Sequence, residues 1–419
     1  MHPYLKYTLI LIFIITPPFK TYAVEFEGGA RTYLDIREDA ENRKIAPVYQ
    51  YIDLNIDNIA EKNISFYLGG WARQDLADKS FNDKRFESDL QYGYLSLSDE
   101  KRTRRLDVGR LVIFEGVSYE RVDGVYGRSN LKYNFSLSAY GGRQAKTNFD
   151  ESGNYIFGGR VSKDSRGLYN LGVSYLREKD YGADLRDEAC ADVWYLLLKT
   201  VELSGRSVMN LEKSDWKEHA CYAVLGPFSK LRVILDSQWI NYEYYFLALT
   251  SEAFKLQPGI ITPGEKVFIL GGEAEYPVSG NFLISAGYKN YDYKISGRAD
   301  YYGGKGRYSV SDRWGIGSDI HRMDSGNDET SYYESRLFAF RNFAKINAVI
   351  DLFNVSYDNR INDVKNAYSG TIALGYKLRS NIRLSSDLSY SHNPEFNREI
   401  RLLFKFIYGF DFEEGEEKL

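Results

Sequence analysis

The sequence is short of the residues that make cross-links and common catalytic motifs. Its 419 residues include two cysteines, nine prolines and three methionines. Two cysteines do not make a disulfide scaffold, and without a Cys-x-x-Cys-His motif the chain does not attach c-type haem itself. The Cys-x-x-Cys, His-Glu-x-x-His, Walker and Gly-x-Ser-x-Gly motifs are also missing, which argues against the metal, nucleotide and hydrolase sites that they mark.

Long hydrophobic runs are equally scarce. The mean hydropathy of −0.43 is too polar for a bundle of membrane helices. Disorder is excluded by 36 Tyr, 24 Phe and 5 Trp, which are spread along the whole chain. The net charge of −4 gives no reason to expect a nucleic-acid partner.

The one markedly apolar stretch lies at the N-terminus and predicts a signal peptide over residues 1–23. Lys6 supplies the positive start, Thr8–Thr16 the apolar region, and Thr21-Tyr22-Ala23 approximates a cleavage site. The apolar region is far shorter than the roughly 20 residues of a spanning helix. An uncleaved anchor is the alternative. Cleavage would leave a mature chain that begins at Val24.

The rest of the chain alternates apolar and polar residues with period two, the pattern of half-buried strands. In 368–378 the even positions carry Tyr, Ile and Leu, and the odd positions carry Ser, Thr, Ala and Lys. The segment 382–391 repeats this arrangement, with Leu384 and Leu388 on one face and Arg383 and Asp387 on the other.

Short polar turns alternate with longer polar connections, which is typical of an up-and-down barrel whose two ends face different environments. We therefore predict an all-β fold, a closed antiparallel transmembrane β-barrel of about 20 strands, with a range of 18 to 22. The stretch 296–330 is the main ambiguity. If 307–323 forms a further hairpin, the count is 22.

The last predicted strand, Glu399–Asp411, carries bulky apolar residues at alternate positions and aromatic residues near its end. It resembles the assembly signal of outer-membrane barrel proteins. The expected barrel spans residues 24–411, and an acidic periplasmic tail, 412–419, follows it.

A soluble sandwich or a β-solenoid would show the same alternation, so the choice of a membrane barrel depends on other features. Up-and-down strands are expected along the full length of the chain. The connections at one end of the expected barrel are short, and those at the other end are long. Aromatic residues near strand ends are expected to form interfacial girdles. These are Tyr49, Tyr51, Trp71, Tyr92, Tyr94, Tyr175, Trp239, Tyr288 and Tyr408.

In a membrane barrel the polar faces enclose the lumen, and about 20 strands leave it too wide for side chains to fill. The lumen is then open to water, plugged by loops or occupied by another protein. The charged residues expected to line it have both signs. They are Asp53, Arg73, Lys132, Arg160, Asp192, Arg232, Asp236, Lys289, Lys377, Arg383, Asp387, Arg401 and Lys405.

The segment from Leu106 to Ser129 resembles the "GR…DGV" segment of outer-membrane porin-like families, through Gly109-Arg110 and Asp123-Gly124-Val125. The resemblance implies a connection near or inside the pore. A plain tight hairpin is the alternative. The constriction candidates are Arg110, Glu115, Tyr119, Glu120, Arg121 and Asp123.

These observations favour a bacterial outer-membrane channel for passive passage of small hydrophilic solutes, with lipid around it and no cofactor or metal of its own. Barrel size and mixed lumen charge also resemble the porin component of porin–cytochrome electron conduits, which implies multihaem cytochrome partners as the alternative. An outer-membrane hydrolase is less favoured, because His219, His321 and His392 have no evident catalytic partner. Cys190 and Cys221, both expected in the lumen, could form a disulfide only if the barrel is distorted, because one strand lies between theirs.

Overall fold

The structure, a computed structural model, describes residues 24–38, 43–59, 63–77, 85–145, 154–165, 167–180, 183–247, 264–326, 330–394 and 398–413. The predicted signal peptide and residues 414–419 of the predicted tail lie outside these ranges. The last strand ends at Glu413, so Phe412 and Glu413, which were expected to begin the tail, belong to the sheet.

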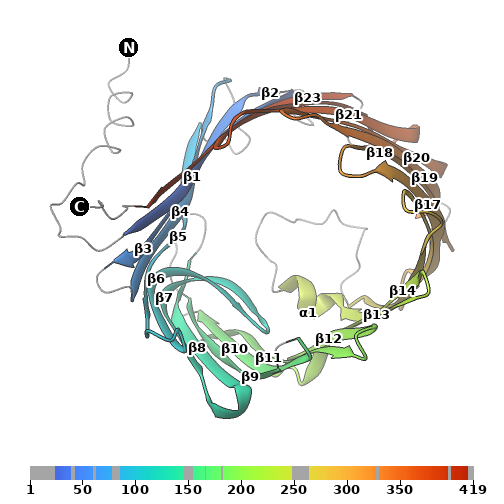
Figure 1. Cartoon of the computed structure of the whole chain (residues 1–419). Coiled ribbons are helices and arrows are strands. Elements are labelled where there is room, and N and C mark those ends of the chain that lie inside the picture. The colour runs from blue at the N-terminus through green and yellow to red at the C-terminus, as the bar shows by residue number, and fades with distance from the viewer. Residues whose placement is uncertain are drawn as a thin grey trace.

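The described residues form one closed antiparallel barrel of 22 strands, in which consecutive strands pair in sequence order (Figure 1). The last strand closes the barrel on the first, with Phe26 opposite Phe412 and Ile36 opposite Leu402. A two-residue strand, β2 (Lys44–Ile45), extends one edge of β1. The barrel strands are β1 (Glu25–Glu38), β3 (Pro47–Ile59), β4 (Ile64–Asp75), β5 (Phe86–Ser98), β6 (Arg104–Glu115), β7 (Ser118–Asn130), β8 (Phe135–Gln144), β9 (Tyr155–Ser165), β10 (Tyr169–Asp180), β11 (Ala183–Leu197), β12 (Val201–Asn210), β13 (Asp215–Phe228), β14 (Leu231–Asn241), β15 (Lys266–Pro277), β16 (Phe282–Tyr293), β17 (Gly297–Val310), β18 (Trp314–Ser325), β19 (Tyr332–Asn342), β20 (Ile346–Ile361), β21 (Val364–Arg379), β22 (Ile382–His392) and β23 (Glu399–Glu413).

The predicted fold class is confirmed, and the strand count lies at the upper end of the expected range. The ambiguous stretch 296–330 contains β17 and β18, joined by a turn at residues 311–313. The further hairpin considered for 307–323 therefore exists. Closure pairs the edges of the first and last strands, which is required where backbone groups meet lipid.

The outer surface carries a band of exposed apolar side chains. Ile372, Leu388 and Phe404, from three consecutive strands, each expose more than two fifths of their surface. Such a surface suits hydrocarbon, and the polar side chains of the same strands face inward. Among the described residues, no helix is long and apolar enough to span a membrane.

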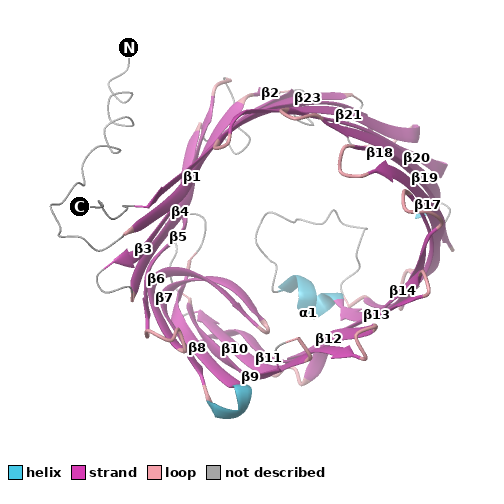
Figure 2. Ribbon diagram, viewed as in Figure 1, coloured by secondary structure: helices cyan, strands magenta, loops and turns pink. Residues whose placement is uncertain are grey.

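Connections are short apart from a few (Figure 2). A 3-10 turn, η2 (Lys132–Asn134), joins β7 to β8. Lys132 was expected on a lumen-facing strand, and this prediction is wrong because the chain turns there. The short helix α1 (Tyr242–Leu247) follows β14 and lies inside the ring of strands (Figure 1).

Candidate functional site

The β6–β7 hairpin leaves the barrel wall and enters the lumen (Figure 1). Strands β5 and β6 pair over only six positions, from Gly93 opposite Arg110 to Ser98 opposite Arg105. Strands β6 and β7 pair with each other as far as Glu115 and Ser118. The tip of the hairpin, residues 111–121, therefore has no strand partner on its β5 side. It is free to bend inward.

Apolar side chains on one face of the tip explain this bend. Leu111, Ile113 and Val122 are buried against Tyr140, Ile156 and Leu176, which stand on β8, β9 and β10. Burial of side chains of this size stabilises by about 1.5–3 kcal/mol each. Since the tip lies inside the ring and covers these wall residues, they mark the inner face of the barrel.

The turn of the hairpin contacts the wall directly. Gly116 has a φ of +58°, and a Cβ atom there would lie 2.0 Å from Ser174 Oγ. The neighbouring amide of Val117 donates a hydrogen bond to Ser174 Oγ at 2.9 Å. Glycine is required at this position both for its conformation and for the close approach.

Ion pairs connect the base of the hairpin to β5. Arg121 pairs with Asp89, a buried carboxylate of β5. Arg110 donates to both carboxylate oxygens of Asp123, at 2.6 and 2.8 Å, and to the Leu90 carbonyl oxygen at 3.0 Å. Strands β5 and β6 do not pair before Gly93 in β5 or after Arg110 in β6. Side-chain contacts thus take the place of backbone pairing in this region.

A buried charge cluster connects the hairpin to β11 and β13. Glu120 pairs with Arg186, whose guanidinium also lies 3.0 Å from the carboxylate of Glu188. Lys217 completes the cluster, with its Nζ 2.8 Å from the Glu188 carboxylate. Removing one member of a buried pair costs about 3–5 kcal/mol, because an uncompensated charge is left behind.

The opposite face of the tip points into the open lumen. Phe114 and Tyr119 expose 69% and 71% of their surfaces, with ring centroids 4.6 Å apart. Glu115 accepts a hydrogen bond from the Tyr126 hydroxyl at 2.5 Å. All six residues predicted for a constriction thus lie on this hairpin. The partners Asp89, Arg186, Glu188 and Lys217 were missed, because they lie on β5, β11 and β13, far from the hairpin tip in the sequence.

Paired residues of neighbouring strands share a face, so the inner face can be followed around the barrel. Along it, ion pairs reach across an intervening strand over a glycine. Arg160 of β9 contacts Asp192 of β11, and a Cβ atom at Gly172 of β10 would lie 2.3 Å from its guanidinium. Lys289 of β16 contacts Asp236 of β14 at 3.0 Å. These long side chains lie flat against the wall.

Most other residues expected in the lumen take part in ion pairs between adjacent strands of this face. Lys377 and Arg383 instead lie directly opposite each other on β21 and β22, and both are exposed. The paired residues are Arg31 with Asp53, Arg73 with Glu87, Arg232 with Glu275, Arg401 with Asp35, and Lys405 with Asp387.

Several aromatic residues expected in interfacial girdles stand on the inner wall. Tyr51 lies opposite Arg31 on one side and Trp71 on the other, and Arg31 pairs with Asp53 across the inner face. Tyr67 and Tyr94 stack at 5.1 Å on the neighbouring strands. The girdle prediction is therefore wrong for Tyr49, Tyr51, Trp71, Tyr92 and Tyr94. On β3, β4 and β5 these aromatic side chains share the inner face with the charged residues.

The two cysteines are free and stand on opposite faces. Cys190 lies opposite Val208 and Cys221 opposite Gly205, positions of β12 that differ by an odd number. Cys190 is buried on the inner side and Cys221 is exposed on the outer side. The expectation that both face the lumen is wrong for Cys221, and the structure contains no disulfide between them.

The three histidines among the described residues lie apart. His219 lies between the rings of Trp216 and Trp239, with Nδ1 2.9 Å from Ser207 Oγ. His321 stacks on Tyr301, and His392 contacts Tyr368. Within the described segments, no three His, Cys, Asp or Glu side chains are placed to hold a metal ion.

Comparisons with known proteins are informative for the fold. No family model matches the chain, and no curated protein matches it. The solved structure of the siderophore receptor PirA from Acinetobacter baumannii aligns with a TM-score of 0.59 and 11% identity, over 94% of this chain and 81% of the receptor. A variant of the ferric enterobactin receptor PfeA from Pseudomonas aeruginosa gives 0.59 and 10%, over 93% and 81%. The fold is that of an outer-membrane β-barrel.

OccAB3 from Acinetobacter baumannii also aligns, at 11% identity over 93% of this chain and 99% of OccAB3. Its TM-score is 0.46.

Proposed function

We propose that the protein is a bacterial outer-membrane channel for small hydrophilic solutes, narrowed by its own β6–β7 hairpin. The observation that carries this proposal is the inward fold of residues 111–121 within a barrel whose inner face is charged. Barrels of 16 to 18 strands already enclose an aqueous channel, so 22 strands leave room for both a hairpin and solutes. No enzymatic step is part of this proposal.

Five of the predicted constriction residues, together with Phe114, would act in two ways. Arg110, Glu120, Arg121 and Asp123 hold the hairpin in place and set the charge beside the passage. Phe114 and Tyr119 project from it and would limit the width of the passage. Because low-dielectric walls focus the field of fixed charges, charge changes here should affect ion selectivity more than changes elsewhere in the lumen.

Planar-bilayer recordings of the purified protein test the proposal. The double variant R110Q/R121Q should shift the reversal potential in a salt gradient toward cation selectivity. The matched control R336Q/R401Q removes two arginines that are also paired with aspartates on the inner wall. It should shift the potential much less. Equal shifts in both variants would contradict a constriction at the hairpin, and an absence of conductance would contradict a channel.

The cytochrome-sheath alternative stays a prediction that no described residue tests. A haem stain of the same preparation, taken from native outer membrane in mild detergent, checks it. A haem protein that copurifies with a barrel of little conductance would replace the channel proposal with the sheath.

A further inference from the structure

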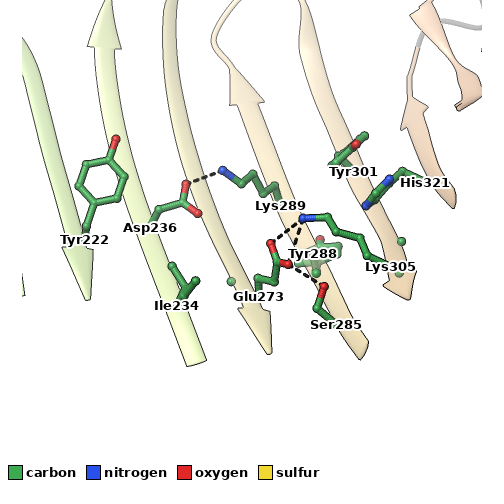
Figure 3. Close-up of a pocket in the computed structure, with 14 residues that line it drawn as sticks. Tyr222, Ile234, Asp236, Glu273, Ser285, Tyr288, Lys289, Tyr301, Lys305 and His321 are labelled. Atoms are coloured by element: carbon green, nitrogen blue, oxygen red, sulfur yellow. Dashed lines mark hydrogen bonds and ion pairs between the residues drawn. The ribbon is translucent and has the colours of Figure 1, made fainter. Parts of the chain in front are cut away.

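A second feature of the inner wall lies beyond the strands that the hairpin covers. Between β13 and β18 the wall contains a depression of about 380 Å³ (Figure 3). The hairpin contacts β5 and β8–β11 through its buried residues and ion pairs, and the depression lies further round the barrel wall. The side chains that decide its chemistry are Tyr222, Asp236, Glu273, Lys289, Tyr301 and Lys305.

Two ion pairs form a flat polar floor. Lys289 reaches Asp236 at 3.0 Å across β15, where a Cβ atom at Gly271 would lie 2.6 Å from the lysine. Lys305 reaches both carboxylate oxygens of Glu273 at 3.0 Å across β16. Figure 3 shows both lysines extended along the wall toward their partners. The floor therefore holds two positive and two negative charges, with no net charge.

This floor retains hydrogen-bonding capacity. An ammonium has three donors and a carboxylate about four acceptor sites. Among the described residues, Lys289 contacts only Asp236, and Asp236 accepts from Lys289 through Oδ2. Donors and acceptors consequently stand side by side and can be used by a ligand without breaking either ion pair.

Aromatic rings border the floor. On one side Tyr301 and His321 stack almost parallel, with centroids 5.0 Å apart and planes 9° apart. Glu334 fixes this pair, since it accepts from the Tyr301 hydroxyl and lies 3.5 Å from His321 Nδ1. On the other side stands Tyr222, whose hydroxyl accepts from Gln238 at 2.8 Å.

From this arrangement we infer that the depression binds a neutral polyhydroxylated solute of the size of a mono- or disaccharide. Each sugar hydroxyl both donates and accepts, which matches a floor of alternating ammonium and carboxylate groups. The C–H face of a sugar ring packs on an aromatic ring, as the flanking tyrosines allow. A small ion would gain less, because each floor charge already has a partner. The inference rests on the proposed channel, which gives solutes access to the lumen.

Gly287 offers a sharp test, because it lies in the centre of the floor. Ordinary contact distances of 3.5 Å or more surround a Cβ atom there, so a side chain can start from this position without strain and extend over the floor. The variant G287L blocks the site. The matched control G306L adds the same side chain to β17 on the outer face, where the nearest atom is Phe282 Cε2 at 3.8 Å.

The experiment measures sucrose binding to the full-length barrel in detergent by isothermal titration, and sucrose block of its current in bilayers. Wild type and G306L should bind sucrose with the same affinity, and G287L should bind at least tenfold more weakly. A second comparison uses two double variants that each remove one Lys–Asp pair of the inner wall. D236N/K289M, which removes a pair of the floor, should weaken sucrose binding as G287L does. The control D387N/K405M, which removes a pair outside the depression, should bind sucrose as wild type does.

Equal sucrose affinity in wild type and G287L, or no binding to wild type, would overturn the inference. Binding of gluconate but not sucrose would also overturn it and assign the site to anions. Sucrose binding that G287L abolishes, in a protein without conductance, would retain the site and remove the channel. The two proposals therefore fail separately.

Discussion

The turn of the inward hairpin is fitted to one side chain of the wall that the hairpin covers: a Cβ atom on Gly116 would lie 2.0 Å from Oγ of Ser174. That same oxygen accepts a hydrogen bond from the next amide, of Val117. The hairpin therefore reaches the wall only because position 116 has no side chain. This contact makes the position of the hairpin sensitive to a single methyl group.

The first prediction is that G116A moves the hairpin away from β10, further into the lumen, and lowers the single-channel conductance. The clash with Ser174 cannot be relieved without displacement, and a non-glycine residue at a φ of +58° adds about 1–2 kcal/mol of strain. Bilayer recordings check it. The control is G167A in the β9–β10 turn, with a φ of +75° and no atom within 4 Å of the added Cβ. Unchanged conductance in G116A would show that the hairpin does not form the narrowest part of the passage.

Period-two alternation was sufficient to predict the strands, because each strand places lipid-facing and lumen-facing residues alternately. The choice of a barrel also needed the full-length meander and the alternation of short and long connections. The period-two pattern also indicated the lumen positions of Asp236 and Lys289. Alternation says nothing about where a strand parts from its neighbour. The separation of β6 from β5 depends on packing between Val122 and Leu176, which are far apart in the sequence.

The other wrong predictions assigned a residue to the wrong face of its strand. Cys221 follows the irregular pairing between β12 and β13, where the register shifts after Val208. Pattern reading across such a shift assigns the wrong face. Tyr51 and Trp71 were expected at lipid interfaces because tyrosine and tryptophan suit both locations. The strand register seen in the structure, followed round the barrel from the face that the hairpin covers, fixes that face as inner.

The second prediction concerns the buried charge cluster beneath the hairpin. E188Q removes the anion that lies 3.0 Å from Arg186 and 2.8 Å from Lys217, and leaves buried cations facing each other. We expect a loss of about 3–5 kcal/mol in the free energy of unfolding. The measurement is urea unfolding followed by the heat-modifiable shift of the barrel on gels.

The matched control is E212Q. Glu212 pairs with Lys213 at 3.1 Å, but the two side chains expose 42% and 55% of their surfaces. An exposed pair of this kind contributes at most about 1 kcal/mol. Similar losses in E188Q and E212Q would show that the cluster carries no special stability.

The third prediction is a difference in thiol reactivity. Cys221 is exposed on the lipid-facing surface and Cys190 is buried on the inner side. In detergent-solubilised barrel, an apolar maleimide should label Cys221 within minutes and leave Cys190 intact, as peptide mass spectrometry would show. C221S is the control and should remove the labelling. Labelling of Cys190 at the same rate, or a disulfide-linked peptide, would contradict the assigned faces.

The fourth prediction is a pH-dependent contribution from Glu265, in the connection that leads into β15. Its carboxylate accepts hydrogen bonds from the amides of Ile295 at 2.9 Å and Ser296 at 3.0 Å, and from the Ser296 hydroxyl at 2.9 Å. Burial alone would raise the pKa of Glu265, but these hydrogen bonds outweigh burial and hold its pKa below the usual value. They join the β14–β15 connection to the β16–β17 turn.

Because the folded-state pKa is lowered, the stabilisation is fully present above the unfolded pKa of about 4.3 and is lost as the pH falls through the folded value. At pH 7, E265Q should lower the thermal midpoint of gel-shift unfolding, through a loss of about 1–3 kcal/mol. The difference between wild type and E265Q should shrink as the pH is lowered below about 4, where wild-type Glu265 becomes neutral as well. E243Q, an exposed change in α1 of the same connection, should be indistinguishable from wild type at both pH values. A gap between wild type and E265Q that stays constant down to pH 3 would mean that the charge of Glu265 plays no part.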